Sequence, residues 1–350
     1  MGELGELVRQ TADRLAEGQV GVVVVGIADG VVEIRGSGRA GGAAGGRPGA
    51  DTLFEVGSVT KVFTSLALAR AAVDGRAALD EPLADVLPAG STVPGRGGSR
   101  ITLQHLAMHT SGLPRLPKGM ALKALLRPHS VDPYARCTAG ALLGGLARTK
   151  LKSEPGRTFR YSNLGAGLLG LALAHRAGTD YEQLVRQEVC APLGLADTVV
   201  TVDAERARRL AQGHDPRRRP AAPWNLAALA GAGALRSTAA DLAAFLQAQL
   251  GAAPDGVAEA IALTRRPEHR TSPFSRVHLG WMAHRLHPRH GGHLQVWHNG
   301  RTGGFASFAG FDPETGVAVG VLGNTSRDVD PPAADLLRRL QSGRKPGQGA

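Results

Sequence analysis

Segments with the residue pattern of β-strands lie near both ends of this 350-residue chain, and the stretch between them has helical periodicity. Near the N-terminus, residues 22–27 and 31–34 are rich in valine and isoleucine and are joined at Asp29-Gly30, a sequence typical of a hairpin. Near the C-terminus, further strands are predicted over residues 280–283, 294–297, 305–311 and 317–322. This order of elements predicts one sheet built from both termini, with a helical region inserted into it.

We therefore expect an α/β (α+β) protein with one domain over residues 1–341, which is ample chain for a core. An amphipathic helix that begins near Leu4 and a closing helix over 332–340 are predicted at the two ends. The expected division is a sheet from about residues 1–75 and 230–341, a mostly helical insertion over about 76–229, and a disordered tail over 342–350.

The composition indicates a globular protein, with 43% hydrophobic and 20% charged residues. A formal charge of +11 is compatible with binding to nucleic acid or to an acidic membrane. The basic residues are scattered, however, and the densest run, Arg217-Arg218-Arg219, lies in a proline-rich loop without an aromatic neighbour. We interpret the charge as a solvated surface and expect no nucleic-acid or membrane partner.

Cys137 and Cys190 are far apart and belong to no Cys-x-x-Cys or Cys/His motif, so neither a disulfide framework nor a zinc site is predicted. We expect no metal and no cofactor. The first residues are acidic where a signal peptide needs basic and apolar stretches. The uncharged apolar stretches are shorter than the ~20 residues of a membrane-spanning helix, and a cytoplasmic location is therefore expected.

The sequence Ser58-Val59-Thr60-Lys61 is the strongest candidate for chemistry. Apolar residues that follow Lys61 predict a helix, and residues three apart on a helix share one face. A serine is a weak nucleophile until a neighbouring base activates it. Lysine can act as that base when it is buried, whereas arginine does not deprotonate. The spacing therefore predicts an activated serine at the N-terminus of a helix.

Two later segments supply groups that such a serine needs. Tyr161-Ser162-Asn163 follows a predicted turn, and a tyrosine hydroxyl near Ser58 and Lys61 can relay a proton, while Asn163 can orient the lysine or the substrate. His298-Asn299-Gly300 begins a late strand, whose backbone N–H groups can form an oxyanion hole. These segments predict one constellation from three distant parts of the chain.

With these motifs the chain resembles the serine β-lactamase and penicillin-binding-protein superfamily, specifically the class C β-lactamase-like hydrolases and esterases. The resemblance runs from the first strand to about Asn324. Its motifs, in chain order, are Phe54 to Lys61, Ile101 to Leu106, His109 to Pro114, Glu154-Pro155-Gly156, Tyr161-Ser162-Asn163, Pro192 to Leu195, Ser237 to Asp241, and His298-Asn299-Gly300.

The resemblance implies the β-lactamase-like fold, an antiparallel sheet flanked by terminal helices. It implies Ser58 as the acylated nucleophile, Lys61 as its activating partner and Tyr161 as the proton relay. Asn163 and the strand at His298 and Gly300 would bind the substrate. The backbone N–H groups of Ser58 and Arg301 would form the oxyanion hole.

One residue departs from the pattern of true β-lactamases, which usually have lysine where this chain has His298. A histidine is mostly neutral at pH 7, and Arg301 is a second candidate for the missing positive charge. The resemblance is thus closer to the esterase and D-aminoacyl peptidase branches.

We expect a serine hydrolase that forms an acyl-enzyme with a small ester, amide or peptide. The alternatives are a β-lactamase or an acyltransferase with the same acyl-enzyme, or a penicillin-binding sensor without turnover.

Three other patterns are given structural interpretations. Residues 165–170 fit the Gly-x-Gly-x-x-Gly motif but lie in a predicted helix of small residues, which favours tight packing over a dinucleotide site. His105 and His109 have metalloprotease spacing without the glutamate, so capping and packing are expected. The histidines between 284 and 293 are assigned to an exposed turn.

Overall fold

The computed structural model describes residues 2–117 and 132–344 of the chain. Within these residues one large sheet has eight strands in the order β2-β1-β10-β9-β8-β7-β6-β5, and every neighbouring pair is antiparallel. The strands are β1 (Gly21–Ala28), β2 (Val31–Gly38), β5 (His269–Arg270), β6 (Ser275–Val277), β7 (Met282–Arg285), β8 (Leu294–Arg301), β9 (Ala306–Asp312) and β10 (Val317–Gly323). The predicted α/β fold with an antiparallel sheet is confirmed.

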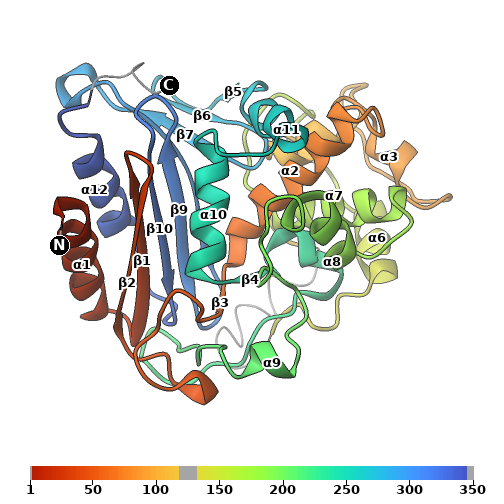
Figure 1. Cartoon of the computed structure of the whole chain (residues 1–350). Helices are drawn as coiled ribbons and strands as arrows, with labels where there is room; N and C mark the ends of the chain where they lie inside the picture. Colours follow the sequence, from red (N-terminus) through yellow and green to blue (C-terminus); the bar gives the residue numbers. More distant parts are fainter. Residues whose placement is uncertain (1, 118–131, 345–350) are drawn as a thin grey trace.

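Strands from the two ends of the chain meet next to the β2 edge of the sheet, where β1 pairs with β10. Helices α1 (Glu3–Ala16) and α12 (Asp330–Gln341) cover one face, and α10 (Ala239–Gln249) covers the other (Figure 1). Both terminal helices were predicted. Their apolar sides pack on the valines of β1 and β10, which are buried on both faces of the sheet.

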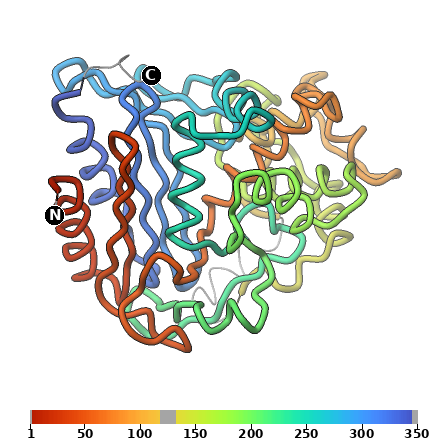
Figure 2. Tube along the Cα trace, viewed as in Figure 1, coloured from red at the N-terminus to blue at the C-terminus, as the bar shows by residue number. Residues whose placement is uncertain are grey.

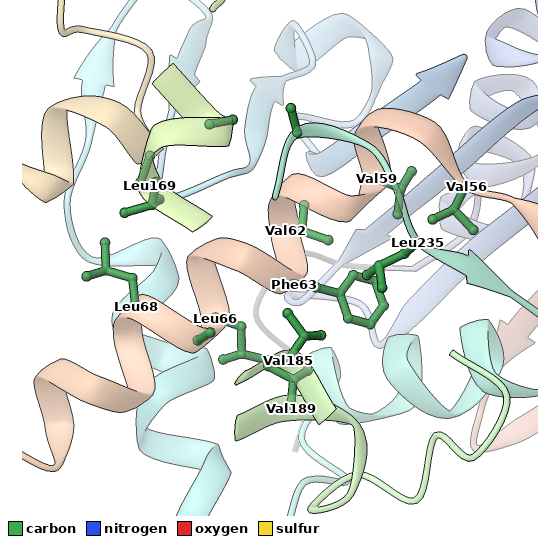
Figure 3. Close-up of a cluster of buried hydrophobic side chains, with 14 of the residues drawn as sticks. Val56, Val59, Val62, Phe63, Leu66, Leu68, Leu169, Val185, Val189 and Leu235 are labelled. Carbon is green, nitrogen blue, oxygen red and sulfur yellow. The ribbon is translucent and has the colours of Figure 1, made fainter. Parts of the chain in front are cut away.

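Helix α2 (Thr60–Val73) lies in the helical half of the molecule, beyond α10, and is surrounded by other helices (Figure 2). Val56 and Val59, which flank the turn before α2, belong to the same buried cluster as Val62 and Phe63 (Figure 3). The remaining helices of this half are α3 (Leu83–Val86), α4 (Leu103–Ala107), α6 (Ala139–Ala147), α7 (Asn163–Arg176), α8 (Tyr181–Val185), α9 (Ala204–Ala207) and α11 (Asp255–Arg265). This burial on all sides fixes the position of the chain around Ser58.

The inserted region contains less helix than its periodicity predicts. Residues 191–226 include a single helix of four residues, α9, and otherwise follow irregular paths. A small second sheet pairs β3 (Phe54–Glu55) with β4 (Arg236–Ser237). Val199 of the inserted region forms a bridge with Arg236 and so ties this region to the segment before Ser58.

The structure describes only the first three residues of the predicted disordered tail, 342–344. Arg344 forms an ion pair with Asp29, while residues 345–350 of the predicted tail lie outside the described residues. The expectation of a single catalytic domain stays a prediction. In the part of the chain that the structure describes, no helix is both long enough and apolar enough to cross a membrane.

Candidate active site

Ser58 lies in a single 3-10 turn, Gly57–Val59, directly before α2. Gly57 has a positive φ of 49°, and a Cβ atom there would lie 2.7 Å from the backbone nitrogen of Arg301. Only glycine combines this conformation with so close an approach of β8. Gly57 therefore allows the strand end at Arg301 to lie against the candidate nucleophile.

Lys61 reaches Ser58 from the first turn of α2. Its Nζ donates hydrogen bonds to Ser58 Oγ at 2.9 Å and to the carbonyl oxygen of Ala232 at 2.6 Å. The side chain is 2% exposed, and burial lowers the pKa of the ammonium well below its ordinary value, with a smaller contribution from the charge of Arg115. An amine that gives up its proton this readily can accept the proton of the serine.

The Ala232 carbonyl is held in place by close packing between α7 and the 3-10 segment Ala227–Ala232. A Cβ atom on Gly170 would lie 2.9 Å from the Cα of Gly231, and one on Gly167 would lie 2.4 Å from Leu229. The glycine pattern of residues 165–170 is thus a packing surface, as predicted. Its effect reaches the site because the packed segment carries the acceptor for Lys61.

Tyr161 lies in the loop before α7, and its neighbours anchor that loop to His109. The backbone N–H of Arg160 donates to the His109 carbonyl at 2.7 Å, and that of Ser162 donates to His109 Nδ1 at 3.3 Å. The His109 and Tyr161 rings are 4.5 Å apart. His109 therefore has the packing role that we predicted, and it positions the tyrosine.

The Tyr161 ring lies near the Lys61 amine and the Arg115 guanidinium. Lys61 Nζ is 5.0 Å from the ring centroid, and the exposed guanidinium of Arg115 is 5.3 Å from it. Burial raises the pKa of Tyr161 to about 12, and its hydrogen bond with Ser58 and the charge of Arg115 only partly offset this effect. The hydroxyl is therefore protonated at neutral pH and can serve as an acid.

His298 is a buried neutral histidine that faces Tyr161, with 6.2 Å between the ring centroids. Burial, together with the charge of Lys61, lowers its pKa to about 3. Its Nδ1 lies 2.6 Å from the carbonyl oxygen of Asn299, which only accepts, so Nδ1 carries the proton and Nε2 has the lone pair. Nε2 is buried without a partner among the described residues. His298 thus provides a hydrogen-bond acceptor and no positive charge.

The backbone of Gly300 and Arg301 runs beside Ser58. A Cβ atom on Gly300 would lie 2.0 Å from the Val56 carbonyl oxygen and 3.0 Å from Ser58 N. Ser307 on β9 donates to that same Val56 carbonyl at 2.7 Å and holds the segment in place. The structure thus brings together the two backbone positions, Ser58 and Arg301, that were predicted to form an oxyanion hole.

Asn163 is the first residue of α7 and borders the cleft beside Tyr134. The two side chains form a hydrogen bond, while Asn163 Oδ1 has no partner among the described residues. Asn163 therefore borders the cleft and does not contact Lys61, whose amine contacts Ser58 and Ala232, and its role in substrate binding stays a prediction.

A cleft of about 590 Å³ contains Ser58, Tyr161, Asn163 and the β8 backbone from Asn299 to Arg301. Its rim is charged on both sides. Arg115 lies on the side of α7, and Asp328 and Asp330 lie on the side of α12. Asn299 donates to the Asp330 carboxylate, and the Arg301 guanidinium is 3.7 Å from Asp328. Burial and the neighbouring Asp328 raise the pKa of Asp330 to about 6.

The sequence analysis missed several groups of this cleft. Arg115 directly follows the His109 to Pro114 motif, which was its only signal. Ala232 contributes a backbone carbonyl, which no residue type reveals. Trp224 lines the cleft. Its backbone N–H donates to Glu55 and its carbonyl accepts from Arg236, and these two side chains form a buried ion pair 3.4 Å apart.

No cofactor or metal site is evident in the described ranges. No group of three or more histidine, cysteine, aspartate or glutamate side chains is placed there to hold a metal ion. His105 caps its own helix, since its Nδ1 accepts from the backbone N–H of Thr102. The predicted capping role of His105 is therefore confirmed.

An antiparallel sheet covered on one face by both terminal helices, with a buried lysine in contact with a serine before the first core helix, is the arrangement of a serine hydrolase. The comparison with known proteins is more specific. The family description "Beta-lactamase" matches residues 7–343, and the chain belongs to that family.

Individual relatives also show the similarity of the chain to beta-lactamases and D-alanine carboxypeptidases in sequence and structure. The D-alanyl-D-alanine-carboxypeptidase/endopeptidase AmpH of Escherichia coli (strain K12) is 31% identical over 319 residues, which cover 86% of this chain and 79% of the relative. A beta-lactamase of Pseudomonas fluorescens is 27% identical over 303 residues, or 78% of this chain and 80% of the relative. The crystal structure of a beta-lactamase/D-alanine carboxypeptidase from Yersinia pestis, complexed with citrate, is 28% identical. It has a TM-score of 0.81 and covers 96% of this chain and 97% of that one. The predicted superfamily and fold are confirmed.

Proposed function

We propose that this protein hydrolyses carboxylic esters, or aminoacyl amides and peptides, through an acyl-enzyme on Ser58. The observation that carries the proposal is the 2.9 Å contact between Ser58 Oγ and the buried Nζ of Lys61. The low pKa of that amine supports a role as general base at neutral pH.

In acylation, the neutral Lys61 amine takes the proton of Ser58 while Oγ attacks the substrate carbonyl carbon. The negative charge on the carbonyl oxygen is stabilised by the backbone N–H groups of Ser58 and Arg301. The protonated Tyr161 hydroxyl gives its proton to the leaving group as the bond to carbon breaks, and the Lys61 ammonium returns a proton to Tyr161. The products are the free alcohol or amine and an ester on Ser58.

In deacylation, a water molecule takes the place of the leaving group beside Tyr161. Lys61, through Tyr161, accepts a proton from this water as its oxygen attacks the ester carbon. Ser58 Oγ then leaves and regains its proton, and the acid is released. Both steps return Lys61 to the neutral amine with which the cycle began.

Two features support ester or amide hydrolysis over the carboxypeptidase and beta-lactamase activities that the relatives' names record. His298 is neutral, donates from Nδ1 to the Asn299 carbonyl and has an unpartnered lone pair on Nε2 among the described residues, so it offers no charge to a substrate carboxylate. Asp328 and Asp330 add negative charge on the same side of the cleft. A free carboxylate on the leaving group would be repelled there.

The test is a substrate panel with Ser58→Ala as the control. The panel contains p-nitrophenyl acetate, D-alanine p-nitroanilide and a chromogenic cephalosporin, and intact mass after treatment with a fluorophosphonate reports the labelled serine. We expect ester or anilide turnover, labelling on Ser58 and loss of both in the variant. Turnover by Ser58→Ala at the wild-type rate would refute the proposal. A stable penicilloyl adduct without any turnover would instead identify a sensor.

A further inference from the structure

A second cavity, about 340 Å³ in volume, lies beside the catalytic cleft. Its walls are mainly aromatic and aliphatic, and they include Phe159, Met282, Trp297, Phe308, Ala334 and Leu337. We refer to it as the side chamber. Its size and apolar walls are those of a small-molecule binding site.

The side chamber follows from how the terminal helices cover the sheet. Helix α1 packs on β1 and β2, and α12 packs on β9 and β10. Met282 on β7 and Trp297 on β8 are paired in register farther along the sheet. Trp297 stacks on Phe308, and both rings line the chamber. Three residues of α12, Asp330, Ala334 and Leu337, face this space, and the short side chain of Ala334 leaves it open.

The side chamber and the catalytic cleft share walls. Met282, Trp297 and Asp330 line both cavities. Phe159, which also lines the chamber, is two residues before Tyr161 in the same loop. A ligand bound in the cleft therefore has an apolar space next to it, with the Asp330 carboxylate at the junction.

The order of residues along β8 indicates which part of a substrate would reach the side chamber. The reacting carbonyl lies at its Arg301 end, beside Ser58. His298 lies next to Tyr161, which protonates the leaving group, and Trp297 comes next on the strand. Arg301 and Trp297 are four residues apart, or about 13 Å. The side chamber is therefore on the leaving-group side of the scissile bond.

We propose that the side chamber binds an extended apolar substituent of the leaving group. The substrate class is then an ester or amide whose alcohol or amine carries a hydrocarbon arm. This inference rests on the proposed function, because it assigns the leaving group by the acidic role of Tyr161.

Acetate esters of ethanol, hexanol and octanol isolate this effect, because all three form the same acetyl-enzyme. Only acylation, and hence kcat/KM, then depends on the alcohol. Each methylene group that enters an apolar site raises kcat/KM by about fourfold. We expect octyl acetate to exceed ethyl acetate by more than about tenfold in the wild type.

Substitutions at Ala334 fill the side chamber in steps. Ala334→Val, Ala334→Leu and Ala334→Phe should lower the octyl-to-ethyl ratio progressively, to within about threefold for phenylalanine, while kcat/KM for ethyl acetate stays constant. Ala258→Phe, at an exposed position on α11, is the matched control and should keep the wild-type ratio. Thermal unfolding of each variant shows whether it is folded, and the valine variant remains informative if phenylalanine prevents folding.

The outcomes separate the two proposals. Hydrolysis of all three esters with no dependence on chain length, or a dependence that survives in the Ala334 variants, refutes the side chamber and leaves the proposed function intact. If neither these esters nor D-alanine p-nitroanilide is hydrolysed, the proposed function fails, and binding of octanol measured by calorimetry tests the chamber alone. Octanol must then bind more tightly to the wild type than to Ala334→Phe, and equal affinity refutes the inference.

Discussion

Lys61 combines two properties that are rarely compatible, a cationic side chain and nearly complete burial. Burial disfavours the ammonium, and the two contacts it makes, to Ser58 Oγ and the Ala232 carbonyl, are both available to a neutral amine. A neutral amine can donate to the carbonyl and accept from the serine at the same time. The geometry around this one residue thus prepares it for the first proton transfer.

Replacement of Lys61 by arginine tests this role directly. A guanidinium does not deprotonate, so we expect Lys61→Arg to lower kcat/KM for p-nitrophenyl acetate by about 10²- to 10⁴-fold. The rate of Ser58 labelling by a fluorophosphonate should fall with it. Lys150→Arg, at an exposed position, is the matched control. A Lys61→Arg enzyme within threefold of the wild type would exclude Lys61 as the general base.

Tyr161 should matter most for substrates whose leaving group needs a proton. With its pKa raised to about 12, the hydroxyl is an acid at neutral pH. We expect Tyr161→Phe to lower kcat/KM for ethyl acetate by about 10²- to 10⁴-fold and for p-nitrophenyl acetate by less than about tenfold. Nitrophenolate leaves without protonation, which explains the difference. Equal losses on the two esters would show that Tyr161 does not donate this proton.

Asp330 is expected to select against carboxylates on the leaving group. At pH 8 its carboxylate is charged, so Asp330→Asn should raise kcat/KM for O-acetyl-lactate by about 5- to 30-fold and leave the methyl ester of that compound unchanged. Because its pKa is about 6, the wild type should lose this discrimination when the pH falls to 5. An unchanged ratio between the acid and its methyl ester in Asp330→Asn would contradict this role.

At the scale of elements, the strands and helices that have a strong hydrophobic periodicity could be predicted from the sequence. The motifs that carry the candidate catalytic residues could also be located from it. β1 and β10 are apolar on both faces, and each terminal helix buries one apolar side, so their patterns are unambiguous. The groups that were missed are placed by tertiary contacts. The Ala232 carbonyl depends on packing against α7, and Asp330 reaches the cleft only because α12 folds back beside β8. Neither of these tertiary contacts can be predicted from the residues that are adjacent in the sequence.

The contact between α7 and the segment Ala227–Ala232 supplies a test at this scale. A Cβ atom on Gly170 would be 2.9 Å from the Cα of Gly231, so Gly170→Ala must push the segment away from the helix. We expect a loss of about 1–3 kcal/mol in the free energy of unfolding. We also expect lower kcat/KM, because the Ala232 carbonyl moves with the segment.

The matched control is Gly145→Ala on α6, where a Cβ atom meets nothing within 4 Å. Alanine there should raise stability by about 0.5–1 kcal/mol, as helix propensity predicts, without a change in activity. Urea unfolding and ester hydrolysis measure both quantities. If Gly170→Ala behaves like Gly145→Ala, the packing contact does not position Ala232.

At the scale of the whole molecule, the pairing of β1 with β10 makes the two termini part of one sheet. The catalytic groups come from segments that this sheet and the α2 core hold together, with Ser58 and His298 separated by more than two hundred residues. Loss of the native fold therefore removes the site as a unit. Buried groups of the site should, in turn, influence the stability of the whole fold.

The buried histidines make that influence measurable through pH. Burial lowers the pKa of His298 to about 3 and that of His109 well below its ordinary value. Between pH 6.5 and 3 the unfolded chain therefore binds more protons than the native one, and stability falls as the pH falls. His298 contributes about 1.4 kcal/mol per pH unit below 6.5, and His109 contributes in the same direction. Asp330, whose pKa is raised to about 6, opposes this trend in part.

We expect the free energy of unfolding in urea to be lower at pH 5.0 than at pH 7.5, with about 2 kcal/mol of the difference from His298 and a further contribution of the same sign from His109. His298→Gln should reduce the difference by the share of one histidine, since glutamine does not titrate. His287→Gln, in the exposed turn between β7 and β8, is the matched control and should keep the wild-type difference. Parallel pH dependences for the wild type and His298→Gln would mean that His298 takes up its proton over the same pH range in the native and the unfolded chain. The imidazole beside Tyr161 would then be a cation below about pH 6.5, which contradicts the lowered pKa.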